Sequence, residues 1–170
     1  MSDVSVVHKD KQYATFKAIA VKIQQSLDLD SILSECRVLH NSRLSTKIKD
    51  NKGQFKPELL IDASAIDLSN RSRLVYLASD VQLKLSKLNS AIEAFENYVI
   101  NNYSSAFQLR TADSKKRFAR LCMKNQIKYY EQCEATLNFI NAMIKDIDQS
   151  GYNLRNMVDL IKILSERKVV

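Results

Sequence analysis

Residues that favour tight turns are scarce in this chain of 170 residues, which has two glycines and one proline. So few turn-formers exclude an all-β sandwich, and the same counts exclude collagen-like and Gly/Ser-rich or Pro-rich disordered classes. No apolar run approaches the roughly 18 residues that a membrane span needs, and the start lacks the pattern of a signal peptide. With 45% hydrophobic residues, the composition predicts an intracellular, mainly helical protein that contacts no membrane.

Motifs for catalysis and cofactor binding are also missing. With two glycines the chain cannot form a phosphate-binding loop, a dinucleotide fingerprint or a nucleophile elbow. The only histidines, His8 and His40, have no partner at metal-ligand or triad spacing and are expected on the surface. We therefore expect no enzyme activity and no cofactor.

Metal-ligand patterns are incomplete. Two acidic pairs have the i, i+3 spacing found in metal-binding bundles, but neither is followed by the histidine of an E-x-x-H motif; they are Glu93/Glu96 and Glu131/Glu134. The three cysteines are odd in number and lack C-x-x-C spacing, which argues against a disulfide framework and a zinc site. We expect no metal, and we expect Cys36, Cys122 and Cys133 to be small buried hydrophobes.

Two long heptad patterns give the strongest structural signal. In each of them, positions that are mostly apolar alternate spacings of four and three. The first comprises Leu74, Ala78, Val81, Leu85, Leu88, Ile92, Phe95, Val99 and the polar Asn102; the second comprises Ala119, Met123, Gln126, Tyr130, Cys133, Leu137, Ile140, Ile144 and Ile147. Two seams of equal length joined by a short connection predict an all-α fold built on a long antiparallel, coiled-coil-like helical hairpin.

Shorter helices are expected at both ends of the hairpin. The spacing predicts helices from about Asp10 to Leu27, after Asp30 or Ser31, and over 58–68, where Pro57 favours a start. The pair Ser150-Gly151 is expected to end the second long helix, because glycine is the common C-cap. The expected organisation is 1–68 with short helices and a basic loop at 45–57, a hairpin over 69–149 and a C-terminal helix over 152–168, folding as one cooperative domain.

The net charge of +7 is concentrated in one stretch. Residues 110–130 hold a single acid, Asp113, and seven bases: Arg110, Lys115, Lys116, Arg117, Arg120, Lys124 and Lys128. On one continuous helix, Arg117, Arg120, Lys124 and Lys128 would form a stripe opposite the seam. Like charges repel along such a stripe, and cations are disfavoured at a helix N-terminus, so an anionic partner is indicated. Phosphate backbone is the commonest such partner.

Two further features extend this candidate nucleic-acid site. Tyr129 follows the stripe and is expected to offer a stacking face to an unpaired base, whereas Tyr130 belongs to the seam. A milder, secondary basic segment precedes the hairpin and comprises Arg43, Lys47, Lys49, Lys52 and Lys56.

The run Met123–Tyr130 (MKNQIKYY) resembles the basic, tyrosine-ended signature of T4-type phage recombination mediators, although Gln126 stands where that pattern has a basic residue. Residues Ile147–Asn156 also resemble that family's break before its final helix. The resemblance covers only the C-terminal third. It implies a small helical protein that forms a ring-like oligomer, binds single-stranded DNA and helps to load a recombinase. A phage protein of this kind would act in the cytoplasm of a bacterial host.

Two hypotheses follow for the function. The first is a non-enzymatic accessory protein of DNA metabolism that binds single-stranded nucleic acid, with a recombinase or a polymerase as protein partner. The alternative is a coiled-coil structural or adaptor protein, such as a phage assembly component or a polymerase-binding factor, whose basic face contacts an acidic protein. Both include self-association, because apolar residues flank the narrow seam and need a cover; they are Val75, Leu77, Leu121, Phe139 and Met143.

Overall fold

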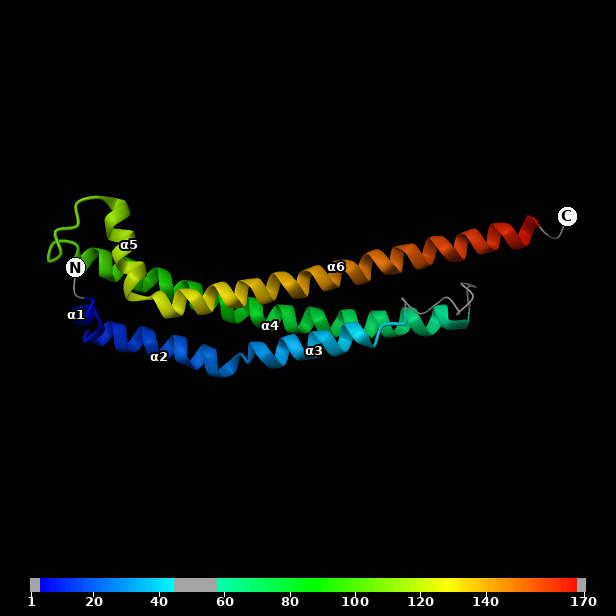
Figure 1. Ribbon diagram of the computed structural model, residues 1–170, viewed down its shortest axis with the longest axis horizontal. Helices are drawn as coiled ribbons and strands as arrows, with labels where there is room; N and C mark the ends of the chain where they lie inside the picture. The colour runs from blue at the N-terminus through cyan, green and yellow to red at the C-terminus, as the bar shows by residue number, and fades with distance from the viewer. Residues whose placement is uncertain (1–3, 45–57, 168–170) are drawn as a thin grey trace. The chain divides into compact units, whose positions relative to one another are not determined.

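The computed structural model describes residues 4–44 and 58–167, and within these ranges all regular structure is α-helical. The all-α prediction is therefore confirmed. The helices are α1 (Ser5–His8), α2 (Lys11–Ser26), α3 (Leu29–Asn41), α4 (Glu58–Tyr103), α5 (Ala112–Cys122) and α6 (Lys124–Arg167), labelled in Figure 1. None of them is long and apolar enough to cross a membrane, as far as the described ranges extend.

The chain forms two compact units, and the long helices α4 and α6 contribute to both. Unit 1 contains residues 1–29 and 80–137, and unit 2 contains residues 30–79 and 138–170. In each unit α4 and α6 pack as antiparallel helices and a shorter N-terminal helix packs beside them, which is the hairpin that the heptad patterns predict. The seam residues of α4 from Leu74 to Val99 are buried.

Unit 1 has an aromatic core between α2, α4 and α5. Phe16 of α2 stacks on Phe95 of α4 with ring centroids 4.8 Å apart, and Phe107 packs on Phe118 of α5 at 4.6 Å. Asp10 begins α2 by accepting a hydrogen bond from the backbone N–H of Gln12 at 2.7 Å. These contacts hold the N-terminal helices and α5 against the hairpin.

Unit 2 has a smaller apolar cluster and a polar one. Leu60, Ala63 and Leu154 are buried together between α4 and α6, with Leu44 and Val158 packed against them. The side chain of Asn70 donates to the carbonyl of Leu39 at 2.9 Å, which fixes the end of α3 on α4.

The first long helix begins earlier than the sequence indicated. The expected short helix over 58–68 and the expected hairpin helix from about residue 70 are one helix, α4, of 46 residues. The sequence SAIDLSN contains polar residues that favour caps, but Asp67 and Asn70 use their side chains in tertiary contacts within unit 2. These contacts remove the local competition that would otherwise end the helix there.

The second long helix differs in two places from the expected 113–149. It is interrupted at Met123, which leaves the helical conformation with φ −111° and ψ 16° and separates α5 from α6. The interruption has no glycine or proline, and both residues at it, Cys122 and Met123, are buried. The expected end at Ser150-Gly151 was wrong, because α6 continues through Gly151 to Arg167 and includes the expected separate C-terminal helix.

Candidate nucleic-acid interface

The basic stretch starts with a well-capped helix. The Thr111 hydroxyl accepts a hydrogen bond from the backbone N–H of Ser114 at 3.1 Å, and the Thr111 N–H donates to the Ser114 hydroxyl at 3.2 Å. This reciprocal capping box, with Asp113 in the first turn, favours helix formation despite the cations that follow. The local sequence therefore fixes where α5 begins.

One face of α5 attaches it to unit 1. Phe118, Ala119 and Cys122 are buried in the aromatic core. The opposite face carries Lys116, Arg117 and Arg120, all exposed, while Lys115 is half-buried and Arg110 is exposed just before the helix. The apolar face thus holds the cations outward at fixed positions.

The predicted stripe is divided between two helices. Lys124 and Lys128 are exposed one turn apart at the beginning of α6, whereas Arg117 and Arg120 belong to α5. Figure 1 shows α5 turned away from the line of α6. The prediction of a stripe on one straight helix is therefore wrong, because the break at Met123 changes the helix direction. The cations instead lie on two helices that meet at a bend.

Two of the seven cations have acidic neighbours. The Arg117 Nε lies 2.9 Å from a carboxylate oxygen of Asp113, and the Arg120 Nε lies 4.0 Å from a carboxylate oxygen of Glu96. Arg110, Lys115, Lys116, Lys124 and Lys128 make no ion pair within residues 4–44 and 58–167. The surface therefore keeps five uncompensated positive charges.

Tyr129 packs inward, unlike the exposed stacking face that the sequence indicated. Its ring is half-buried against the core of unit 1, and its hydroxyl donates to the carbonyl of Leu27 at 3.1 Å. Burial, followed by the neighbouring Cys133, raises the pKa of the Tyr129 phenol. Tyr130 also packs against this core. Stacking of a base on Tyr129 is therefore not a feature of this surface, whose exposed charged groups are the cations.

An acidic groove borders the basic surface in unit 1. It has a volume of about 290 Å³ and lies between α4 and α6. Its lining includes Arg120 and four carboxylates, Glu93, Glu96, Glu131 and Glu134. The two acidic pairs noted in the sequence thus come together. Within the part of the chain that the structure describes, they form no group of three or more ligands able to hold a metal ion.

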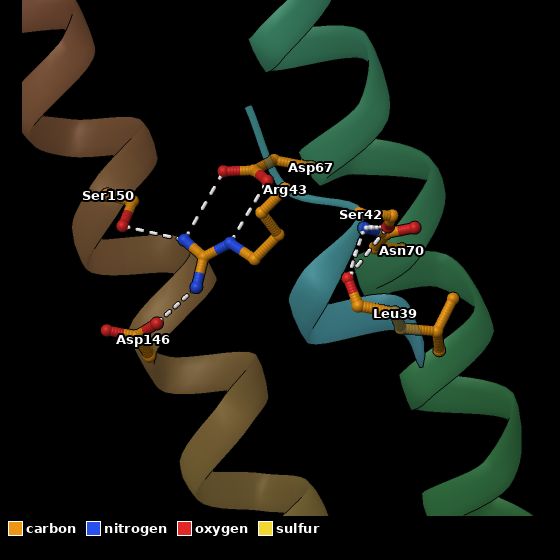
Figure 2. A network of polar contacts seen from close by, with 7 residues as sticks. All are labelled: Leu39, Ser42, Arg43, Asp67, Asn70, Asp146 and Ser150. Atoms are coloured by element: carbon orange, nitrogen blue, oxygen red, sulfur yellow. Dashed lines mark hydrogen bonds and ion pairs between the residues drawn. The ribbon is translucent and has the colours of Figure 1, made fainter. Parts of the chain in front are cut away.

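The secondary basic segment does not form a surface with Arg43. This side chain is only 4% exposed, and it joins α3 to both long helices of unit 2 (Figure 2). Its guanidinium donates to Asp67 at 3.1 and 3.4 Å, to the Ser150 hydroxyl at 2.8 Å and to Asp146. Arg43 is therefore a buried structural cation. The other members, Lys47, Lys49, Lys52 and Lys56, lie outside the described residues.

The cysteines have the expected environment. Cys36, Cys122 and Cys133 are each at most 2% exposed and are free thiols. Burial raises the pKa of Cys122 to about 11 and also raises the pKa of Cys36 and Cys133. At neutral pH these groups are uncharged thiols, which behave as small hydrophobes.

Two polar sites were missed at the level of sequence. The Arg43 cluster combines residues separated by up to 107 positions, so no local spacing could show it. Asp10 accepts hydrogen bonds from the hydroxyls of Tyr98 and Tyr103, at 2.7 and 2.6 Å, across a similar separation. In both cases the only feature of the sequence that could have indicated the site was a single polar residue beside an apolar helix face.

No family model matches the chain, and neither a curated protein nor a solved structure matches it significantly.

Proposed function

We propose that the protein binds single-stranded nucleic acid through the exposed cations of residues 110–128 and acts in DNA metabolism as an accessory protein without catalysis. The supporting observation is a set of five cations around α5 and the beginning of α6 that make no ion pair within residues 4–44 and 58–167. Unpaired cations held together repel one another, and a phosphate backbone relieves that repulsion while releasing counterions.

The acidic groove beside this surface favours single-stranded over double-stranded nucleic acid. A duplex bound at the bend brings a second phosphate backbone within reach of neighbouring acidic side chains. Glu93, Glu96, Glu131 and Glu134 line the groove next to Arg120, so a second strand would meet repulsion there. A flexible single strand can follow the cations and avoid the groove.

The resemblance to phage recombination mediators supports a more specific form of this proposal. In the run Met123–Tyr130, the two lysines are exposed while Met123, Ile127 and Tyr130 pack against the core. The basic positions of the motif are thus available to phosphate. On this basis the protein would deliver single strands to a recombinase, or to a polymerase, as its protein partner.

The direct test measures binding of a fluorescent single-stranded oligonucleotide by anisotropy. A triple variant, Lys116→Gln, Lys124→Gln and Lys128→Gln, removes exposed cations without removing an ion pair of the described residues. We expect its affinity at moderate salt to fall at least tenfold, because about three phosphate contacts disappear. A matched duplex should bind the wild-type protein more weakly than the single strand.

A matched control removes the same charge elsewhere in unit 1. Lys11, Lys17 and Lys22 are exposed on α2, and their replacement by Gln gives the same net charge as the triple variant. We expect the control variant to keep nearly the wild-type affinity. Equal losses in the two variants would mean that only net charge matters and would refute the proposed site.

The alternative is a helical adaptor whose basic surface contacts an acidic protein. It is favoured by the contacts of Arg117 with Asp113 and of Arg120 with Glu96, because these cations already accept carboxylate partners. The same titration separates the two functions. An adaptor would show no oligonucleotide binding at moderate salt, and it would bind an acidic peptide more weakly in the triple variant than in the control.

A further inference from the structure

An apolar groove in unit 2 lies between the beginning of α4 and the second half of α6. It has a volume of about 770 Å³, and Leu60, Leu154 and Val158 are among its lining residues. Three large apolar side chains of this lining are exposed, namely Ile61 by 78%, Leu68 by 65% and Tyr152 by 61%. Exposed apolar residues gathered around a groove indicate an interaction surface.

Gly151 lines the same groove and packs against none of the residues that the structure describes there. It stands in the interior of α6, where glycine is about 1 kcal/mol less favourable than alanine. A Cβ atom at this position would meet nothing within 4 Å. Within residues 4–44 and 58–167, neither a helix end nor side-chain packing accounts for a glycine here. Close approach of something outside the chain does account for it, because the missing side chain leaves the helix backbone open.

The charges on either side of Gly151 indicate what approaches. Asp148 precedes Gly151 by three residues and Arg155 follows it by four. The midpoint between the two charged residues therefore falls between Gly151 and Tyr152, and each of them lies about 5 Å from that midpoint along the helix axis. Both residues line the groove. Arg155 has no ion-pair partner among the residues that the structure describes, and Asp148 pairs with Arg71 on the rim. This arrangement is complementary to itself under a two-fold rotation.

We propose that the groove is the interface with a second copy of this chain, in which the two α6 helices cross antiparallel at Gly151. In this arrangement Arg155 of each copy faces Asp148 of the other, and Tyr152 of each copy lies over Gly151 of the other. The two-fold symmetry makes both charge contacts attractive, as an isologous interface requires. Asp148 keeps its bond with Arg71, since a carboxylate accepts several hydrogen bonds.

The size and charge of this face fit a protein partner better than a polyanion. A stable interface buries about 800 Å² on each partner, which one exposed helix stripe does not supply. Here two adjacent helices contribute, and the stripe of Leu154 and Val158 continues along α6 to Ile161, which is 38% exposed. The groove lining carries two acids and two bases, Asp67, Asp148, Arg71 and Arg155. Without excess positive charge it has no general attraction for phosphate.

The first test is analytical ultracentrifugation of the full chain over a range of micromolar concentrations. We expect a monomer–dimer equilibrium that weakens at least tenfold in Leu68→Asp and in Gly151→Leu. The matched control is Leu83→Asp, which should dimerise like the wild type; Leu83 is a leucine of α4 in unit 1 and is 55% exposed, against 65% for Leu68. Gly151→Leu should also melt no lower than the wild type at low concentration, since leucine favours helix over glycine, so that a weaker dimer is not a failure to fold.

The second test uses charge exchange and identifies the two-fold contact. Asp148→Arg and Arg155→Glu each place like charges face to face in a homodimer, so each variant alone should be largely monomeric. Mixed in equal amounts, they restore two attractive contacts, and a heterodimer should form.

A monomeric wild type at 100 micromolar, or unchanged dimerisation in Leu68→Asp and Gly151→Leu, would overturn the proposal. A dimer that both charge variants form alone would overturn the two-fold crossing at Gly151.

Discussion

Unit 1 buries aromatic rings and exposes its charges, whereas unit 2 buries a charge and exposes apolar side chains. In unit 1, Phe16, Phe95 and Phe118 belong to one core, and the cations of α5 lie outside it. In unit 2, Arg43 is enclosed with Asp67, while Ile61 and Leu68 are exposed. The same pair of long helices thus presents two kinds of surface. We propose a polyanion as the partner of the first surface and a second copy of the chain as the partner of the other.

The largest effect is expected from the core of unit 1. Phe95 is 4% exposed and contacts the rings of Tyr13, Phe16 and Tyr98. Replacing Phe95 by Ala should lower the free energy of unfolding by about 4 kcal/mol, because transfer and cavity terms add. Urea unfolding followed by circular dichroism measures this. A loss below about 1 kcal/mol would contradict a tightly packed aromatic core.

The matching change in unit 2 removes the buried cation. Arg43→Met leaves Asp67, whose side chain is 5% exposed, without its partner. We expect the free energy of unfolding to fall by about 3 kcal/mol, which is the lower end of the range for breaking a buried ion pair. The lower end applies because Asp146 is 59% exposed and stays hydrated. Urea unfolding of Asp146→Asn serves as the control and should show a much smaller loss. Equal losses would place the main contact of Arg43 at Asp146.

The sequence predicted the structural features that depend on hydrophobic periodicity and missed those that depend on contacts with residues far along the chain. The heptads placed Leu74, Leu88 and Ile140 correctly in the core because each is set by residues three or four positions away. The break at Met123 carries no local signal, since neither glycine nor proline stands at it. Gly151 was misinterpreted as a helix end because its local chemistry is that of a C-cap. The cations of 110–128 were found, while Arg43 and Tyr129 were assigned to the surface because their inward partners lie far along the chain.

A smaller, pH-dependent effect is expected where α2 meets α4. Hydrogen bonds from Tyr103, Gln12 and Tyr98 lower the pKa of Asp10, so this stabilisation is present above the unfolded pKa of about 4 and is lost as pH falls through the lower folded value. The hydrogen bond to Asp10 raises the pKa of Tyr103 to about 12. The stabilisation from this phenol is present below about pH 10 and is lost as pH rises toward 12.

An ultraviolet titration of tyrosine tests this arrangement. Asp10→Asn keeps a side chain able to cap α2 but removes the charge. We expect it to lower the pKa of the Tyr103 phenol and to flatten the loss of stability below pH 4. If the tyrosine titration curves of the two proteins coincide, the contact of Asp10 with Tyr103 is not formed in solution.

The smallest effect is expected for the stability of the triple variant Lys116→Gln, Lys124→Gln and Lys128→Gln. Glutamine and lysine have similar helix propensities, and removing the i, i+4 repulsion of Lys124 and Lys128 contributes a few tenths of a kcal/mol. The melting temperature should therefore equal or slightly exceed that of the wild type. A clear decrease would show that these lysines support the fold.

The salt dependence of single-strand binding tests the central claim most directly. If the five cations that make no ion pair among the described residues contact phosphates, the logarithm of the binding constant should fall linearly with the logarithm of salt concentration, with a slope of about −3.5. The triple lysine variant should have a slope smaller in magnitude by about 2, while the control variant at Lys11, Lys17 and Lys22 keeps the wild-type slope. A slope near zero, or one that is the same in the wild type and both variants, would contradict binding of nucleic acid at this surface.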